Sequence, residues 1–348
     1  MYNYSITSVT PNNRFAQNKI KKLLAQEDIR LDQNLDYTCA IFDSQGQAIA
    51  TGSYFHNTLR CLAVSSKHQG AGLMNRIVSH LVNELSLQGL THLFLYTKID
   101  SGQLFSQLGF YEICRVEGNL VFMENRRDGF QSYLDSLIPA PAGANSIAAL
   151  VMNCNPITLG HQFLIEKAAA ENDHVHLFLL EEDASIFPYT VRRQLVEEAC
   201  QHLDNLTIQP TADYIISQAT FPSYFQADSE AVIAGHSLLD AKLFLQIAER
   251  LNIQKRYVGE EPYSKMTATY NQVLTEVLDE AGIELVIVPR KTQNGQAISA
   301  SNVRLAVARD DWEFVEASTP ATTLAYLQSP QASPVIERIK SCLNLTHH

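Results

Sequence analysis

The sequence predicts an α/β protein with two domains, and three observations support this prediction. The chain has 348 residues, more than a single hydrophobic core usually serves. Residues 138–145 are rich in Pro, Ala and Gly, which is the composition of a linker. After this stretch, strand-like and helix-like segments alternate, as is typical of a parallel, doubly wound sheet. We therefore expect one domain at residues 1–138 and a second at residues 145–348.

The first half of the chain predicts a mixed α+β domain. Residues 12–26 have helical periodicity, and two alternating segments joined by a Gly-containing turn predict a hairpin. The expected elements after that helix are hairpin strands at 37–43 and 48–54, a strand at 58–64, a long helix after residue 72, a strand at 92–96, a short helix at 101–108, a strand opened by residues 109–110 and a connecting helix at 128–137.

The turn before the long helix has the properties of a phosphate-binding loop. Glycines let the backbone approach a ligand closely, and the free amides of a helix start attract a pyrophosphate. The alternative is that Gly70 and Gly72 only form a tight turn. We expect the binding residues of this loop to be Lys67, His68, Gln69, Gly70, Ala71 and Gly72.

This layout resembles the GNAT superfamily of acyl-CoA-dependent acetyltransferases. Residues 67–72 stand where that superfamily has (Gln/Arg)-x-x-Gly-x-(Gly/Ala), and residues 105–110 stand where it often has Tyr-x-x-x-Gly-Phe. Phe105 replaces the tyrosine commonly proposed as the general acid, and a phenylalanine cannot donate a proton. The resemblance therefore implies binding of a CoA-like pyrophosphate and pantetheine arm more than it implies acetyl transfer.

The second half begins with a buried strand at 146–152, a turn at Asn155-Pro156 and a helix that starts near Gly160. Ligands of a parallel sheet bind at the carboxyl ends of its strands. The later expected elements are strands at 174–180, 206–208, 255–259 and 284–289, helices at 188–200 and 267–280, and a segment without a clear pattern that ends near residue 251. Candidate residues at the strand ends are Asn153, Glu181, Gly259 and Arg290.

Two motifs of this half lie at strand-to-helix junctions, where free amides and the helix dipole suit a polyphosphate. Residues 155–161, Asn-Pro-Ile-Thr-Leu-Gly-His, resemble the (His/Thr)-x-Gly-His signature of the nucleotidyltransferase superfamily. Residues 298–304, Ile-Ser-Ala-Ser-Asn-Val-Arg, resemble its Ile-Ser-x-(Ser/Thr)-x-x-Arg signature. Members of this superfamily have a Rossmann-like fold, attack the α-phosphate of a nucleotide and release pyrophosphate.

This resemblance implies a catalytic role for Thr158, His161 and Arg304. We expect His161 to donate to the α- and β-phosphate oxygens, Thr158 to position a phosphate oxygen through its hydroxyl and Arg304 to pair with the γ-phosphate. The alternative for His161 is a histidine that only caps or packs the helix start. The nucleotide-binding residues implied by the motifs are Asn153, Asn155, Thr158, Gly160, His161, Gly259, Ser299, Ser301 and Arg304.

The two halves together resemble the citrate lyase ligase family over about residues 2–340. Residues 258–263, Val-Gly-Glu-Glu-Pro-Tyr, followed by Tyr270-Asn271 and residues 287–290, Ile-Val-Pro-Arg, add to the likeness. The resemblance implies that ATP, with Mg²⁺, and acetate are used to acetylate a thiol, and that AMP and pyrophosphate leave, through acetyl-AMP. The thiol belongs to a phosphoribosyl dephospho-CoA group on the citrate lyase acyl carrier protein, its gamma subunit.

Two other functions are alternatives. One is an adenylyltransferase that acts on a phosphopantetheine or mononucleotide acceptor, and the other is an acetyltransferase whose second half only senses a nucleotide. The metal ligands are not identified by the sequence: residues 181–183, Glu-Glu-Asp, could hold Mg²⁺ or form a solvated acidic loop. Arg192 and Arg193 could reach a phosphate or form ion pairs at the surface.

Composition sets further limits. The net charge of -11 argues against nucleic acid as the main partner, and no apolar run approaches the ~18 residues of a membrane span. The six cysteines are scattered without metal-ligand spacing, and residues 1–5 have no signal-peptide pattern. We therefore expect a cytoplasmic protein with reduced thiols, in which Cys154 packs rather than reacts.

Overall fold

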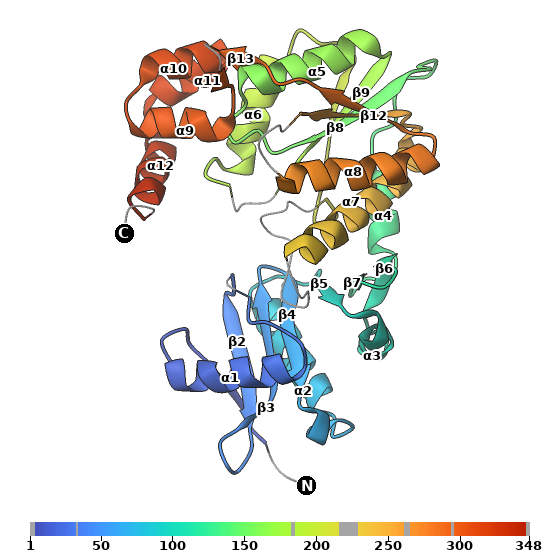
Figure 1. The fold of residues 1–348 in the computed structure, drawn as a ribbon, viewed down its shortest axis with the longest axis vertical. Helices are drawn as coiled ribbons and strands as arrows, with labels where there is room; N and C mark the ends of the chain where they lie inside the picture. Colours follow the sequence, from blue (N-terminus) through green and yellow to red (C-terminus); the bar gives the residue numbers. More distant parts are fainter. Residues whose placement is uncertain are drawn as a thin grey trace. The chain divides into compact units, whose positions relative to one another are not determined.

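The structure is a computed structural model that describes residues 4–32, 34–181, 185–215, 229–260, 265–293 and 296–345. By its internal contacts the chain forms two compact units. The first unit contains the residues up to Ser132 and also the first part of helix α7 (Ser229–Leu251), as far as Leu239. The second unit contains the chain from Tyr133 to Thr220 and the chain from Asp240 onward. Each unit has its own hydrophobic core. In Figure 1 the first unit is mainly blue to teal and the second mainly green to red.

The first unit is built on a seven-stranded mixed sheet. Every neighbouring pair is antiparallel except β4 and β5, which pair in parallel only at Thr58 with Phe94 and at Leu59 with Leu95. Because the pairing stops after two residues, no further ladder joins these strands toward their carboxyl ends. The strands, in the sheet order β1-β2-β3-β4-β5-β7-β6, are β1 Ile6–Ser8, β2 Tyr37–Phe42, β3 Ala48–Phe55, β4 Thr58–Val64, β5 Phe94–Thr97, β7 Leu120–Glu124 and β6 Tyr111–Val116.

Helices cover both faces of this sheet. Ile20 and Leu24 of α1 share a core with Ala40, whereas Ile77 and Leu81 of α2 share another. Gly52 of β3 has a packing role, since a Cβ there would lie 2.5 Å from Ile77 Cγ2. The helices are α1 Arg14–Gln26, α2 Leu73–Leu87, α3 Gly102–Gln107 and α4 Gly129–Ser136, with short 3₁₀ turns η1 Ser66–His68 and η2 Ile99–Ser101.

The second unit contains a parallel five-stranded sheet with the order β10-β9-β8-β11-β12. The chain starts at the central β8, moves outward to β10, and returns to β11 on the other side of β8. The boundary between β8 and β11 is therefore the topological switch point, at which ligands of such sheets bind. The strands are β8 Ile147–Met152, β9 His174–Leu179, β10 Leu206–Gln209, β11 Lys255–Gly259 and β12 Glu284–Val288; a separate hairpin pairs β13 Thr292–Gln293 with β14 Gln296–Ala297.

Adjacent residues of β11 identify the helices on each face of this sheet (Figure 1). Tyr257 donates from its hydroxyl to Glu171 of α5, whereas Arg256 donates from Nη2 to Asp240 of α7. Successive side chains of a strand point to opposite faces, so α5 and α7 lie on opposite faces. The helices are α5 Leu159–Glu171, α6 Tyr189–Ala199, α7 Ser229–Leu251, α8 Lys265–Glu280, α9 Ala300–Ala308, α10 Trp312–Ser318, α11 Ala321–Gln328 and α12 Ser333–Leu345, with the 3₁₀ turn η3 Pro330–Ala332.

The predicted fold class is confirmed: a mixed α+β unit with the GNAT-like layout is followed by a Rossmann-like parallel sheet. The sequence did not predict β7 or the helices α10 to α12. It also gave no element for the region that contains α7, whose apolar residues do not form the single stripe that signals an amphipathic helix. Among the described residues, no helix is long and apolar enough to cross a bilayer.

Candidate functional site

A pocket of about 380 Å³ lies at the carboxyl ends of β8, β11 and β12, which is the switch point of the parallel sheet. Its lining combines strand ends, the first turns of α5 and α9, and two cations that follow β12. The polar and glycine residues of this lining are Asn153, Thr158, Gly160, His161, Gly259, Arg290, Lys291, Ser299 and Ser301. The fold therefore brings together most of the residues that the two sequence motifs predicted.

Thr158 and His161 form a reciprocal cap at the start of α5. The backbone N–H of Thr158 donates to His161 Nδ1 over 3.1 Å, and the backbone N–H of His161 donates to Thr158 Oγ1 over 3.4 Å. Because Nδ1 accepts a backbone hydrogen, the neutral ring carries its proton on Nε2. The cap therefore fixes both the orientation and the tautomer of an imidazole that lines the pocket.

The environment of His161 keeps its ring neutral. Burial, and secondarily the positive charge of Arg290, lower the pKa of His161 to about 4. At neutral pH the Nε2–H group is thus a neutral donor rather than a cation. Thr158 is 1% exposed and its hydroxyl is used by the cap, so its observed role is to orient His161. The phosphate contact predicted for the Thr158 hydroxyl stays a prediction.

Gly160 allows the two motifs to approach each other. A Cβ at this position would lie 3.3 Å from the carbonyl oxygen of Ile298, which is tighter than ordinary contact. Ile298 directly precedes Ser299, the N-cap of α9, whose side chain accepts the backbone N–H of Asn302 over 3.1 Å. The starts of α5 and α9 therefore meet in one pocket, although they lie far apart in the sequence.

Arg304 connects the two motifs. Its Nη1 donates to the carbonyl oxygen of Asn155 and its Nη2 donates to Ser301 Oγ over 3.1 Å. Burial lowers the pKa of Arg304, but a guanidinium remains charged at neutral pH. Neither Asn155 nor Arg304 is among the residues that line the pocket. In the structure, Arg304 ties the loop after β8 to the first turn of α9.

Arg290 and Lys291 are the cations of the pocket; the sequence named Arg290 as a candidate at a strand end, without a specific role, and did not name Lys291. Arg290 donates from Nε to the carbonyl oxygen of Glu260 over 2.8 Å, and Lys291 Nζ lies 5.9 Å from the centre of the Phe163 ring. Burial lowers the pKa of Arg290, which still carries its charge. A second basic residue directly after Arg290 was the signal that could have found Lys291.

Arg192 supports the backbone beside the pocket by hydrogen bonds to carbonyl oxygens. Its side chain is fully buried, and it donates to the carbonyl oxygens of Asn153 (2.8 Å), Leu180 (2.6 Å) and Phe187 (3.0 Å). The sequence left open whether Arg192 reaches a phosphate, and the structure uses it for backbone support instead. Arg193 forms an ion pair with Glu197 at the surface, which was the alternative to a phosphate contact.

The described residues hold no cluster of three or more His, Cys, Asp or Glu side chains that could bind a metal ion. Glu181 accepts the backbone N–H of Thr211, whereas Glu182 and Asp183 lie outside the described residues, as do residues 261–263 of the family-like segment. Cys154 is 1% exposed, and burial raises the pKa of its thiol, so this sulfur stays protonated.

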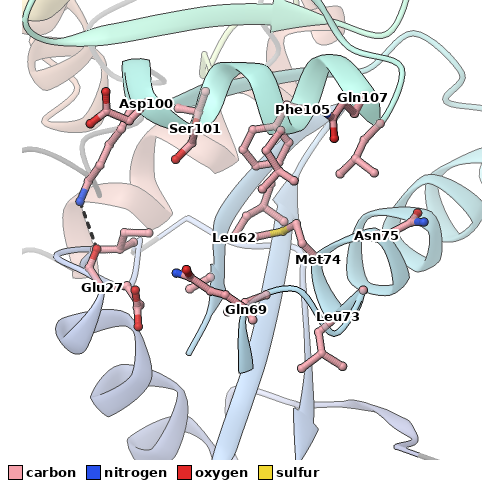
Figure 2. Close-up of a pocket in the computed structure, with 18 of the residues that line it drawn as sticks. Glu27, Leu62, Gln69, Leu73, Met74, Asn75, Asp100, Ser101, Phe105 and Gln107 are labelled. Carbon is pink, nitrogen blue, oxygen red and sulfur yellow. Dashed lines mark hydrogen bonds between the residues drawn. The ribbon is translucent and has the colours of Figure 1, made fainter. Parts of the chain in front are cut away.

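A second pocket, of about 730 Å³, lies in the first unit beside the carboxyl ends of β4 and β5 (Figure 2). Of the predicted loop, His68, Gln69, Gly70 and Gly72 line it, and Lys67 and Ala71 do not. Gly70 and Gly72 have φ values of +79° and +71°, a left-handed backbone that favours glycine. Gly72 is also the N-cap of α2 and makes no side-chain cap, which leaves the first amides of α2 available.

The lining of this second pocket combines apolar side chains with polar and charged ones. Figure 2 shows Phe105, Leu62 and Met74 close together in it, with Gln69 and Glu27 toward the loop and α1. Phe105 is 3% exposed and offers no proton donor. At one side Lys98 donates from Nζ to the carbonyl oxygen of Glu27 over 3.1 Å, drawn as a dashed line in Figure 2. Such a lining suits a long, weakly polar chain.

The parallel sheet, the two converging helix starts and the paired cations define an α/β protein with a pocket at its switch point whose donors suit phosphate. Comparison with known proteins makes the assignment specific. Residues 147–327 match the family model described as the citrate lyase ligase C-terminal domain. The chain is 36% identical to the citrate (pro-3S)-lyase ligase of Haemophilus influenzae over 89% of this chain and 94% of that protein.

The Escherichia coli protein of the same name is also 36% identical, over 91% of each chain. The chain therefore belongs to the citrate lyase ligase family, and it is an enzyme of the ligase class. Among solved structures, a GNAT N-acetyltransferase from Escherichia coli in complex with CoA is similar, with 22% identity, a TM-score of 0.28, and coverage of 36% of this chain and 83% of that one. At this score the similarity adds nothing to the topology described above.

Proposed function

We propose that this chain uses ATP and acetate to acetylate the thiol of the prosthetic group on the citrate lyase acyl carrier protein, with release of AMP and pyrophosphate. The observation that carries the proposal is the convergence of the α5 and α9 starts with Arg290 and Lys291 at the switch point. A pocket with two helix starts and two cations suits the polyphosphate of a nucleotide. The family membership supports the choice of acceptor.

In this proposal the acetate carboxylate attacks the α-phosphate. The new bond joins a carboxylate oxygen to the α-phosphorus, the bond to the bridging oxygen breaks, and the electron pair leaves with pyrophosphate. Negative charge grows on the equatorial and leaving oxygens, so fixed donors lower the barrier. The neutral Nε2–H of His161 donates to these oxygens, while Ser299, Ser301 and the amides of α9 hold the leaving phosphates.

Arg304 acts in this mechanism with Gly160, Gly259 and Asn155 as part of the nucleotide-binding framework. By its bonds to Asn155 and Ser301 it keeps the two motifs together, and its pairing with the γ-phosphate stays a prediction. Mg²⁺ would neutralise charge on the polyphosphate as a hard cation. No carboxylate is found among the described residues that line the pocket, and Mg²⁺ usually keeps several water ligands beside the phosphate oxygens of its substrate.

The pocket of the first unit would bind the prosthetic arm of the carrier. The arm is a phosphoribosyl dephospho-CoA, and its pyrophosphate suits the amides between Gly70 and Leu73, while its pantetheine chain suits the apolar lining. We assign the binding of the prosthetic arm to residues 67–72 of a first domain, which spans residues 1–138. We assign the adenylylation to a second domain, which spans residues 145–348. The cytoplasm, where thiols stay reduced, is the proposed location.

The proposal is tested by measuring the exchange of labelled pyrophosphate into ATP in the presence of Mg²⁺ and in the absence of carrier protein. The measurement is made with acetate and without acetate. Exchange that requires acetate supports acetyl-AMP formation. If exchange is silent, carrier protein that bears its prosthetic group is added, because the carrier could be required first. Silence under both conditions, with pyrophosphate release when phosphopantetheine or a mononucleotide is supplied, would overturn the proposal in favour of an adenylyltransferase.

A further inference from the structure

We propose that Asn153 binds the acetate carboxylate in the active site and that Ser185 orients the Asn153 side chain for this task. The inference rests on the proposed function, because it concerns the group that attacks the α-phosphate. It replaces the general nucleotide-binding role of Asn153 with a specific one.

Asn153 is the first residue after β8, and it lines the same pocket as His161. In-line displacement places the attacking and leaving oxygens on opposite sides of the phosphorus. The start of α9 supplies donors for the leaving pyrophosphate, so the attacking carboxylate needs a donor of its own. Asn153 is a polar side chain of the lining that belongs to neither helix start.

The orientation of the Asn153 amide follows from its neighbour. Ser185 donates from its hydroxyl to Asn153 Oδ1 over 3.1 Å, and Ser185 is only 9% exposed. An amide side chain has one acceptor oxygen and one donor NH₂ group. Because an ionised carboxylate can only accept hydrogen bonds, the NH₂ group is the part of the amide that can hold acetate, and this group has no hydrogen-bond partner among the residues that the structure describes.

The main chain of Asn153 is also fixed. Arg192, which is fully buried, donates from Nη1 to the Asn153 carbonyl oxygen over 2.8 Å. Both the backbone and the side chain of Asn153 are therefore held before any ligand binds. A donor that is positioned in advance costs little ordering when the ligand arrives.

A neutral donor suits a nucleophilic carboxylate. One N–H···O bond from Asn153 holds one acetate oxygen and leaves the other free to attack the phosphorus. A lysine or arginine in this place would stabilise the charge of free acetate and so reduce its tendency to attack. The pocket supplies its cations, Arg290 and Lys291, from the segment after β12 instead, where they suit the phosphates.

The test is the acetate dependence of pyrophosphate–ATP exchange in full-length variants. Asn153→Ala should raise the KM for acetate by roughly tenfold to a hundredfold, the range for loss of a hydrogen bond to a charged group, with the KM for ATP changed less than about twofold. Asn153→Asp should raise it further, because its carboxylate repels acetate. Ser185→Ala should raise it by a few-fold, since the amide is then free to rotate.

Asn18→Asp is the matched control, because it makes the same change on an exposed face of α1 and should leave both constants unchanged. An unchanged acetate KM in Asn153→Ala, or a rise in the KM for ATP alone, would overturn the inference while leaving the proposed function intact. If Asn153→Ala does not fold, Ser185→Ala is judged by the same criterion. Absence of acetate-dependent exchange in the unmodified chain, with and without carrier, would overturn the proposed function and the inference together.

Discussion

The two pockets share a local design but are completed differently. In each, a strand is followed by a tight turn and a helix start that offers free amides. The turn of the first unit ends in Gly72, which makes no side-chain cap, and the pocket beside it contains Phe105 without a hydroxyl. The turn of the second unit ends in Thr158, which caps α5 jointly with His161. The first design favours binding an arm, and the second favours stabilising developing charge.

The largest expected effect is the loss of acetate-dependent exchange when the site of the second unit is changed, with no loss when the pocket of the first unit is changed. His161→Ala should reduce acetate-dependent exchange by roughly 10²-fold or more, because a fixed donor at developing phosphate charge contributes this much. Arg304→Ala should have an effect of about the same size, because it removes the bonds that hold the two motifs together and the proposed contact with the γ-phosphate. Initial rates of exchange at saturating ATP and acetate provide the measurement. Phe105→Ala in the other pocket is the control and should leave carrier-free exchange unchanged. Near-normal exchange in a well-folded His161→Ala protein would remove the role proposed for this imidazole.

A smaller effect is expected from the glycine turn of the first unit. Gly70→Ala combined with Gly72→Ala places side chains in a left-handed backbone, which costs about 1–2 kcal/mol per residue and should distort the loop. The KM for the carrier protein should rise roughly tenfold, while carrier-free exchange stays the same. Gly89→Ala, at φ +82° beyond the end of α2, is the matched control. An unchanged carrier KM would contradict the assignment of this pocket to the prosthetic arm.

The pH dependence of the exchange rate and of the stability tests the role proposed for His161 in the pocket of the second unit. The folded pKa of His161, about 4, lies below the unfolded value of about 6.5. Exchange per folded molecule should therefore show no inflection attributable to His161 near pH 6.5. Its neutral form is favoured by folding, so the related stability is present above about pH 6.5 and is lost as the pH falls toward about 4. Exchange rates and urea unfolding across this range test both statements.

The pKa of His176 in β9 is lowered, like that of His161, but His176 lines neither of the two pockets. Burial lowers its pKa to about 4, so it should contribute to the acid loss of stability and not to the exchange rate. His176→Gln is the variant that isolates this part. If exchange in His176→Gln loses the pH profile of the unmodified chain, the separation between stability and chemistry is wrong.

The smallest effect is expected from restoring a hydroxyl in the first unit. Phe105→Tyr should leave ATP-dependent acetylation of the carrier unchanged, because the proposed chemistry takes place at the other pocket. Incubation with acetyl-CoA and carrier, without ATP, should give no acetylated carrier in either form. Acetyl-CoA turnover by the unmodified chain would instead favour the acetyltransferase alternative, and turnover gained only by the variant would show that the pocket retains the geometry for acetyl transfer.

Much of the fold was predictable because its signals are local. Alternating strands and amphipathic helices reveal themselves within a few turns of chain, and the glycine and Asn-Pro turns mark where they end. Helix α7 was not predicted because its apolar residues do not form one stripe. Strand β7 was missed although all of its residues are buried, because its four apolar residues before Glu124 lack the alternation of a half-buried strand.

The sequence by itself determined the two strand-to-helix motifs and the replacement of a general acid by Phe105. These features depend on neighbours in the chain, so residue type and spacing are sufficient to show them. The meeting of α5 with α9 depended on the strand order, and the bonds of Arg192, and the bond from Arg304 to Asn155, end on carbonyl oxygens that every residue possesses. Only the tertiary structure could decide these contacts, because a backbone acceptor leaves no trace in the sequence.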